Sequence, residues 1–448
     1  MSSGTPEPVA GSAAGPALDE VIEALCAAGA HTARVSHCDL HGKCRSKDLP
    51  LRRLDLAVAG LGFCLISMIE DINGNPLELP GFAAGSPFPD MHSHVDLTTG
   101  VILPWEPETA WFIADLRGDR GLSPRGALRR AARAAESLGL RAQMAPELEF
   151  YLLAREGGAV ERYGAGRGLA YTTGRQADPE GAFRRIHRAL VGLGLGVTTA
   201  HHEFSPGQFE INLDHGEALD AADRAFRFKQ ALRELAAGER LQASFMAKPF
   251  SDSEGSSCHV HVSLLDADGV NAFAAADGGL SDMCLAFIAG VLEHADGLTA
   301  LGAPTVNSYR RLVEGGMAPT RADWGSDHRF SYIRIPPERG AGTRVEVRGA
   351  DASANPYLLL AGILIAGLDG VRRRLRPPPP LSPGQGSPAR SLPGTLERAL
   401  EALQADEALV QGLGSELVRT FAALKRSEAQ RERRHVGDWD WAEYGLHA

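Results

Sequence analysis

The spacing of apolar residues changes twice along this chain, near residue 30 and near residue 120. Between Leu18 and Ala28 apolar residues recur every three or four positions, and Gly29 follows them, which predicts a helix. From residue 32 to residue 116 short apolar runs alternate with Gly, Pro and Asn, which predicts a strand-rich, self-contained domain. Its strands are expected at Ala33–Val35, Gly62–Ile69, Gly100–Leu103 and Trp111–Leu116.

A second and larger domain is expected to follow. Ser123 and Pro124 supply an N-cap and a first-turn proline for a helix that ends at Gly139. Helix-like and strand-like segments then alternate, which indicates an α/β or α+β domain. Further helices are expected at 181–193, 221–236 and 357–368, and a surface loop at 376–393. The chain is therefore divided into a disordered tail (1–17), an N-terminal domain (18–117) and a C-terminal domain (118–448).

Composition and charge exclude several classes of protein. The 448 residues are 44% apolar and 23% charged, as in an ordinary globular protein, and the net charge is -10. This acidic balance argues against binding to nucleic acid or to an anionic membrane, both of which need clustered cations. No apolar stretch approaches the ~20 residues of a membrane span, and residues 1–17 do not resemble a secretory signal. With only six, irregularly spaced cysteines, we expect a reduced, cytoplasmic protein.

Polar residues occupy every second position in several strand-like segments. Because a strand places residues i and i+2 on the same face, each segment has one polar and one apolar face. A turn at Pro206-Gly207 would also bring two further carboxylates together from adjoining strands. The residues that share a face are Glu147 and Glu149; His259, His261 and Ser263; Arg344, Glu346 and Arg348; and Glu203 and Glu210.

Several carboxylates side by side repel one another unless cations neutralise them. One such segment alone is more often an exposed sheet face, but the set together indicates a site for more than one cation. Carboxylate oxygens suit Mg²⁺ or Mn²⁺, whereas arginines suit carboxylate and phosphate groups. The combination predicts phosphoryl transfer from a nucleotide, and the absence of a GxxxxGK[ST] motif excludes a P-loop enzyme. The arginines are Arg311, Arg329, Arg334, Arg344 and Arg348.

Ordered motifs from about residue 30 to the C-terminus carry a resemblance to a known family. They are residues 97–105, 146–150 (PELEF), 201–211 (HHEFSPGQFEI), 246–249 (MAKP), 255–264 (GSSCHVHVSL), 304–312 (PTVNSYRRL), 329–336 (RFSYIRIP) and 345–357. With these motifs the chain resembles the glutamine synthetase family, in its bacterial type I-like branch. The resemblance implies an α+β chain, with an N-terminal β-grasp domain before a glutamine synthetase-type catalytic α/β domain. It also implies a homo-oligomer, expected to be a dodecamer, whose active site is shared between subunits.

The resemblance further implies a role for individual residues, with glutamate as substrate, ATP as cosubstrate and Mg²⁺ or Mn²⁺ as cofactor. One divalent ion would be held by Glu149, Glu203 and Glu210, and a second by Glu147, His259 and Glu346. Glutamate would be bound by Gly255, Arg311 and Arg348, beside Glu254. The nucleotide and its phosphoryl groups would be bound by His261, Ser263, Arg334 and Arg329, the last of them catalytic. An amine would then displace phosphate from a γ-glutamyl phosphate intermediate.

Departures from the family pattern concern the ammonium site. Met317 stands in the catalytic flap where the family has a glutamate, and Cys64 stands where the N-terminal domain has an aspartate. Glu254 replaces an asparagine, and Glu314 or Asp90 would have to supply the missing acid. No tyrosine occurs between residues 357 and 444, so the family's adenylylation tyrosine is absent.

These changes favour an organic amine, such as a short alkylamine, ethanolamine or a polyamine, over ammonia as the acceptor. Three alternatives remain open: an ammonia-using glutamine synthetase, a ligase acting on another carboxylic acid, and a non-catalytic family scaffold. His37, Cys38, His41 and Cys44 are of metal-ligand types, but their spacing fits no standard zinc pattern. We interpret them as incidental residues of the β domain.

Overall fold

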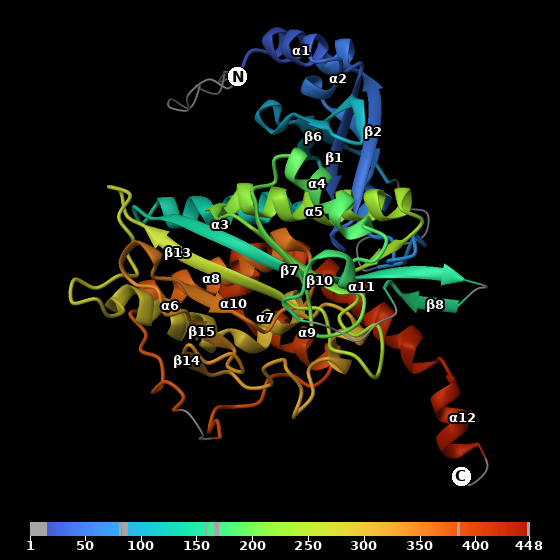
Figure 1. The fold of residues 1–448 in the computed structure, drawn as a ribbon. Coiled ribbons are helices and arrows are strands. Elements are labelled where there is room, and N and C mark those ends of the chain that lie inside the picture. Colours follow the sequence, from blue (N-terminus) through green and yellow to red (C-terminus); the bar gives the residue numbers. More distant parts are fainter. Residues whose placement is uncertain are drawn as a thin grey trace.

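Two β-sheets organise the residues that this computed structural model describes, namely 16–79, 82, 88–156, 159–164, 170–382 and 386–445 (Figure 1). The tail expected at residues 1–17 lies outside the described residues, apart from its last two positions. In spatial order the first sheet contains β2 (Cys44–Pro50), β1 (Thr32–Cys38), β6 (Glu106–Arg117), β4 (Asp90–Val95) and β3 (Leu61–Cys64), with β5 (Val101–Leu103) paired to β6.

Strand β6 separates two hydrophobic clusters because its side chains alternate between the two faces of the sheet. Phe112 lies in a cluster with the apolar residues of α1 (Leu18–Ala27) and α2 (Leu54–Ala59). Trp111 and Ile113 face the other way and join the core of the larger domain. The helix expected from Leu18 is therefore confirmed, and its apolar stripe covers the outer face of the small sheet.

The strand expected at Gly62–Ile69 is wrong in its second half. Strand β3 ends at Cys64, and Leu65–Met68 form a 3₁₀ turn. Leu65 and Met68 are both buried, and a separation of three residues matches a helical turn, whereas a strand would point them to opposite faces.

The second sheet forms the wall of the larger domain. Its spatial order is β14 (Trp324–Ser326), β15 (Ile333–Ile335), β16 (Val345–Val347), β13 (Cys258–Leu265), β7 (Arg141–Glu156), β10 (Gln208–Leu213) and β9 (Val197–His202). Strands β8 (Ala159–Arg162), β11 (Gly216–Glu217) and β12 (Gln242–Ser244) also pair with the long β7. The expected α+β class is confirmed, and most strand pairs in this sheet are antiparallel.

Helices cover one side of this sheet (Figure 1). They are α3 (Pro124–Glu136), α4 (Ala182–Gly192), α5 (Ala218–Gly238), α6 (Asp282–Glu293), α7 (Ala295–Gly302), α8 (Pro356–Arg373), α9 (Leu396–Ala405), α10 (Glu407–Leu413) and α11 (Ser415–Arg433). Helix α12 (Asp438–Tyr444) projects away from the domain (Figure 1). Short 3₁₀ helices also occur at Leu51–Arg53, Leu97–Thr99, Gly174–Gln176, Val306–Arg310 and Gly340–Gly342. Helix α8 is buried along nearly its whole length, as its continuous apolar sequence predicts.

Two glycines let α6 and α8 cross in close contact. A Cβ on Gly290 would lie 2.3 Å from the carbonyl oxygen of Ala366, and one on Gly370 would lie 2.1 Å from that of Ala286. Any larger residue at either position would push the two helices apart.

Arg125 ties the small domain to the large one. Its guanidinium is buried and contacts Asp223 of α5 at 2.8 Å, Asp115 of β6 at 2.7 Å and Asp96 at 2.9 Å. Tyr357 of α8 donates its hydroxyl hydrogen to Asp223 at 2.7 Å. The expected boundary at residues 117–118 falls where β6 ends, and the division of the chain into domains remains a prediction.

No single helix in the described ranges is long and apolar enough to cross a membrane, although α6 and α7 reach that length together with a bend of 72° between them. His294 lies at this bend. Its ring nitrogens contact Asp406 at 2.7 Å and Asp369 at 3.0 Å, which joins the bend to α8 and to the start of α10. Burial alone would lower the pKa of His294, but the two carboxylates outweigh it and the pKa is raised.

This raised pKa predicts a pH-dependent contribution to stability. A group whose pKa is higher in the folded state contributes stability that is complete below its unfolded pKa, about 6.5, and is lost as the pH rises through the folded value. We expect His294→Gln to lower the free energy of unfolding by about 2 kcal/mol near pH 6 and by much less near pH 9. Urea unfolding at both pH values measures this, with the exposed His435→Gln as control. An equal loss at both pH values would contradict the ion-pair account.

Candidate active site

The strand register aligns acidic residues in one row across the large sheet. Glu149 lies opposite Glu210 of β10, and Glu147 lies opposite His259 of β13. Glu346 of β16 extends the row on the far side of β13. Because directly opposed residues point to the same face, these side chains converge.

Glu203 reaches the same face from the turn between β9 and β10. Gly207 in this turn has a φ of +72°, which favours glycine, so the turn expected at Pro206-Gly207 is confirmed. The backbone N–H of Glu203 donates to the carbonyl oxygen of Gln208 at 2.8 Å, which closes the turn.

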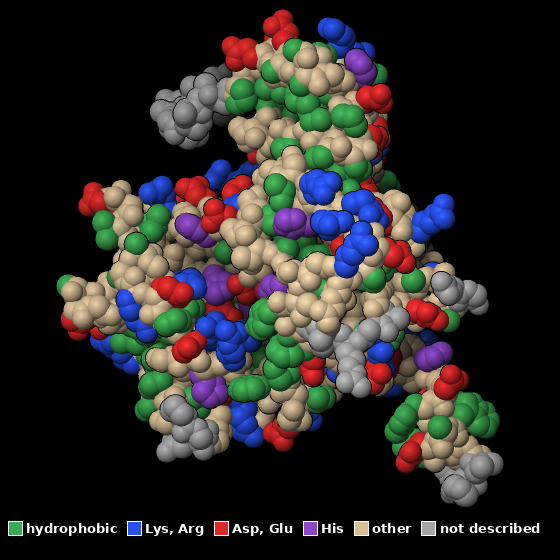
Figure 2. Space-filling model, viewed as in Figure 1, with side chains coloured by type: hydrophobic (Ala, Val, Ile, Leu, Met, Phe, Trp, Pro, Cys, Tyr) green, Lys and Arg blue, Asp and Glu red, His purple; other side chains and the backbone are tan. Residues whose placement is uncertain are grey.

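The converging side chains line a cavity of about 680 Å³. Figure 2 shows acidic, basic and histidine side chains gathered around a hollow on this face. The cavity contains every predicted site residue except Ser263, which lies two positions beyond His261 on the same face of β13. These lining residues are Glu147, Glu149, Glu203, Glu210, Glu254, Gly255, His259, His261, Arg311, Met317, Arg329, Arg334, Glu346 and Arg348.

Three overlapping groups of side chains bring potential metal-ligand atoms within 4.8 Å of one another. The group expected for one ion, Glu147 with His259 and Glu346, is present as a unit. The other expected group is divided between two clusters that share Glu210. These clusters are Glu149, Glu210 and His259, and His201, Glu203 and Glu210. His37, Cys38, His41 and Cys44 form no such group among the described residues.

His201 is a site residue that the sequence interpretation missed. Its Nε2 lies 2.7 Å from Glu203 and 3.7 Å from Glu210, and its ring stacks on Tyr171 with centroids 5.0 Å apart. The signal was available, because His201 is separated from Glu203 by the same two positions that define the other polar faces. Tyr171 had no such signal.

Burial and neighbouring charges split the carboxylates into two kinds. Burial raises the pKa of Glu149, and it raises the pKa of Glu210 to about 9 together with repulsion from the neighbouring carboxylates. Burial would also raise the pKa of Glu147 and of Glu346. In Glu147 the contacts with His259 and His261 outweigh it and lower the pKa, and in Glu346 the charges of the neighbouring histidines and arginines do so.

This set of groups fits bound divalent cations. Asn212 donates to Glu147 at 3.0 Å, and Gln208 and the backbone N–H of Ser257 donate to Glu149 at 3.1 and 2.8 Å, so that the carboxylates are held in place. Oxygen-rich ligands with hydrogen-bonded support are typical of Mg²⁺ or Mn²⁺ sites.

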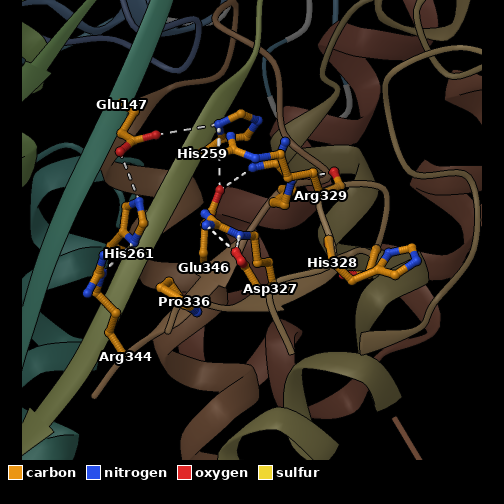
Figure 3. Close-up of polar contacts among 12 residues, drawn as sticks. Glu147, His259, His261, Asp327, His328, Arg329, Pro336, Arg344 and Glu346 are labelled. Atoms are coloured by element: carbon orange, nitrogen blue, oxygen red, sulfur yellow. Dashed lines mark hydrogen bonds and ion pairs between the residues drawn. The ribbon is translucent and has the colours of Figure 1, made fainter. Parts of the chain in front are cut away.

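Arginines lie beside Glu346 and His261 at one end of the row of carboxylates, where Figure 3 shows Arg329 and Arg344. Arg334 donates to Glu346 at 2.6 Å, Arg348 also contacts Glu346, and Arg344 donates to His261 at 3.1 Å. These guanidiniums approach the carboxylates from the side of β15 and β16. The cavity is therefore lined by both anions and cations, as binding of a metal together with anionic substrates requires.

Arg311 has an unused donor. Its Nη2 donates to the hydroxyl of Ser257 at 2.8 Å, whereas its buried Nη1 has no hydrogen-bond partner among the residues that the structure describes. A Cβ on the adjacent Gly255 would lie 2.4 Å from the carbonyl oxygen of Ala247, so only glycine fits there. Glu254 is exposed, with its backbone carbonyl held by the hydroxyl of Tyr151 at 2.6 Å. This part of the cavity offers a guanidinium to an anionic group.

Exposed apolar side chains line another part of the cavity. They are Tyr171, Phe204, Val313, Met317 and Phe330, and Met317 is 50% exposed. Glu314 is not in the cavity and pairs with Arg321 at 3.2 Å. Cys64 and Asp90 also lie outside it, paired across β3 and β4. Of the acids considered from the sequence, Glu314 and Asp90 therefore do not line this cavity, whereas Glu254 does.

Comparisons with known proteins agree with this site. A family model described as the glutamine synthetase catalytic domain matches residues 121–444. Glutamine synthetases of Methanococcus voltae and Thermus thermophilus are both 35% identical to this chain, over 92% and 95% of it and over 95% and 98% of their own lengths.

Two solved structures are also similar. A GmaS/ADP complex has a TM-score of 0.83 and 33% identity, covering 94% of this chain and 98% of that one. An apo GmaS structure without ligand has the same TM-score and 32% identity, covering 95% and 99%.

The carboxylate cluster predicts opposite effects on stability and on cation affinity. A carboxyl group whose pKa is raised by folding opposes folding increasingly as the pH rises above its unfolded pKa. We expect Glu210→Gln to stabilise the protein in the presence of a chelator, by about 2 kcal/mol near pH 8 and by less near pH 5. The same variant should bind Mn²⁺ at least about 10-fold more weakly.

Thermal unfolding with chelator and a Mn²⁺ titration measure the two effects. Glu161→Gln, an exposed substitution on β8, is the matched control and should change neither. If Glu210→Gln bound Mn²⁺ as tightly as the unchanged protein, Glu210 would not be a ligand.

Proposed function

The chain belongs to the glutamine synthetase family, and from that premise we propose that it joins the γ-carboxylate of glutamate to an organic amine with hydrolysis of ATP. Membership of the family makes it an ATP-dependent carbon–nitrogen ligase. The proposal concerns the acceptor and the residues that carry out the reaction.

The observation that carries the proposal is the thioether of Met317 in the cavity. A side chain that accepts a proton and offers negative charge favours an ammonium ion, and Met317 does neither. The apolar side chains of Val313 and Phe330 and the aromatic side chains of Tyr171 and Phe204 line the same cavity. Burying methylene groups of an alkyl arm against such surface is favourable by ~0.8 kcal/mol each. A bare ammonium ion gains nothing from it and loses hydration.

Two solved GmaS structures support a ligand-binding role for the same fold, and one of them is a complex with ADP. An ADP complex of a similar protein agrees with a nucleotide site in this cavity. The curated relatives are glutamine synthetases, which keeps ammonia as the second candidate acceptor. A non-catalytic scaffold is disfavoured, because buried carboxylates that repel one another have no structural benefit without cations.

In the proposed reaction Arg311 and Gly255 orient glutamate, with the free Nη1 of Arg311 available to a carboxylate. The γ-carboxylate attacks the terminal phosphorus of ATP and ADP leaves, while Arg329 and Arg334 hold the charge that develops on the phosphoryl oxygens. Divalent ions held by the two predicted sets of ligands, one around Glu210 and one around Glu346, would neutralise phosphate charge. The neutral amine nitrogen then attacks the γ-carbonyl carbon, phosphate leaves, and the nitrogen loses one proton to solvent.

We also propose that the protein acts as a homo-oligomer, with a dodecamer as the expected form. Cys64 is exposed on the N-terminal domain and lies outside the cavity of its own chain. It would influence the amine only if a neighbouring subunit brought it there. Light-scattering mass measurement in solution tests this arrangement.

The function is tested by an amine panel with glutamate, ATP and Mg²⁺, read by phosphate release and by product mass. We expect short alkylamines, ethanolamine or a polyamine to support turnover with formation of the matching γ-glutamyl amide. Phosphate release with ammonium as the best acceptor would instead make the protein a glutamine synthetase, and no nucleotide binding at all would favour a scaffold.

Met317 provides the sharpest variant. We expect Met317→Glu to raise kcat/KM for ammonium relative to the best amine by about 10-fold, because it restores a counter-charge. The shift should be incomplete because Cys64 stays non-acidic. Met246→Glu, at another exposed methionine outside the cavity, is the control. An unchanged ratio in Met317→Glu would remove residue 317 from acceptor choice.

Arg329 should matter more for chemistry than for binding. The charge that it meets appears only as the phosphoryl group transfers, so Arg329→Gln should lower kcat by roughly 10² with a small change in KM. Steady-state kinetics in ATP measure both constants. Arg310→Gln, an exposed arginine that pairs with Glu432, serves as control. A variant in which only KM rises would place Arg329 on bound substrate instead.

A further inference from the structure

Asp327 lies at the edge of the candidate site but does not line its cavity. Its Oδ1 accepts two hydrogen bonds from Arg334, at 2.9 Å from Nε and at 2.6 Å from Nη2. The Nη1 of the same guanidinium donates to Glu346 at 2.6 Å. Arg334 is therefore held between the carboxylate of Asp327 at the surface and that of Glu346 inside the site. Figure 3 shows where Asp327 and Glu346 lie.

We propose that Asp327 is a positioning residue, which holds Arg334 in the orientation that binds the phosphoryl groups of the nucleotide. This inference rests on the proposed function, in which Arg334 receives those groups. An arginine has five N–H donors, and the contacts with Asp327 and Glu346 use three of them. Two N–H groups remain for phosphate oxygens, in a plane that the two carboxylates fix.

Glu346 is a competing partner for Arg334, which is why the orientation of Arg334 has to be held. Guanidinium groups pair with carboxylates in a bidentate manner when nothing competes. Without Asp327, Arg334 could turn a second N–H group onto Glu346, which is nearly fully buried and belongs to a candidate cation group. That rotation would both remove a donor from the nucleotide and occupy a carboxylate that the cation needs.

The backbone at Asp327 indicates that its side chain matters. Its φ is +48°, in a region that non-glycine residues seldom adopt. The turn itself is held by the backbone, because β14 pairs with β15 and the N–H of Asp327 donates to the carbonyl oxygen of Ile335 at 2.9 Å. Glycine fits this conformation more easily, and aspartate is one of the few other residues that tolerate it, so the turn can present a carboxylate to Arg334.

The ion pair contributes little to the fold. The side chain of Asp327 is 59% exposed, and pairs that reach the solvent in this way stabilise proteins weakly. Arg334 itself is only 13% exposed. Loss of Asp327 should therefore appear in nucleotide binding and turnover, and not in unfolding.

Two substitutions at residue 327 separate the two effects. Asp327→Gly removes the carboxylate and relaxes the backbone, whereas Asp327→Asn keeps an Oδ1 acceptor and tolerates the same φ. We expect kcat/KM for ATP to fall about 10- to 100-fold in Asp327→Gly and by a smaller factor in Asp327→Asn. The thermal midpoint of Asp327→Gly should equal or exceed that of the unchanged protein. The order of the variants by kcat/KM should thus differ from their order by thermal midpoint.

Two further proteins serve as controls. Arg374 also has a positive φ, of +53°, but lies exposed at the end of α8 and outside the cavity, so Arg374→Gly should leave kcat/KM unchanged. In an Arg334→Ala background, Asp327→Gly should cause no additional loss, because the group that it positions is absent. An equal loss in both backgrounds would overturn the proposal.

A titration with ADP and Mg²⁺ keeps this test separate from the test of function. Weaker ADP binding in Asp327→Gly than in Asp327→Asn supports the proposal whatever the acceptor is. If the unchanged protein forms a γ-glutamyl amide and Asp327→Gly retains full kcat/KM and ADP affinity, Asp327 has no positioning role and the ligase assignment stands. If the unchanged protein forms no amide with any amine or ammonium, the proposed function fails, and the ADP affinities still decide the role of Asp327.

Discussion

The repulsion among carboxylates on one face of the large sheet is the constraint on which the rest of the site depends. Strand register places Glu149 opposite Glu210, Glu147 opposite His259, and Glu346 opposite His261. Such a row is unfavourable without positive charge nearby. Part of that charge comes from imidazoles and guanidiniums, and bound divalent cations would supply the rest. The repulsion therefore lowers the stability of the protein without bound cations, and cation binding would remove it. Such a loss of stability is common at functional sites.

Two arginines of the cavity use their hydrogen-bond donors in different ways. Arg334 contacts Glu346 within the site and Asp327 outside it, whereas Arg311 keeps one buried donor without a partner. Because Asp327 shares the guanidinium of Arg334, Arg334 neutralises Glu346 only in part, and Glu346 stays available to a metal ion. Arg311, by contrast, leaves a donor ready for an anionic substrate. In our proposal acceptor choice depends on a different side chain, the uncharged Met317 at another part of the cavity.

Much of this site could be predicted from sequence because its main signal is local. A period of two determines which residues of one strand share a face, and this was sufficient to group Glu147 with Glu149 and His259 with His261. Strand order and register are not local. The sequence therefore could not show that Glu149 and Glu203 belong to different candidate cation groups. Asp327 gave no signal, because both its positive φ and its contact with Arg334 arise from the packing of β14 against β15. The end of β3 at Cys64 was missed for a related reason, since burial of the following turn overrides its strand-like composition.

A competition reaction tests the central claim most directly. The unchanged protein is given glutamate, ATP and Mg²⁺ with equal concentrations of ¹⁵N-labelled ammonium and a short alkylamine, and the two γ-glutamyl amides are quantified by mass in one sample. The account predicts that the alkylamide exceeds labelled glutamine by about 10-fold or more. Labelled glutamine in equal or greater amount would contradict it and would identify ammonia as the acceptor.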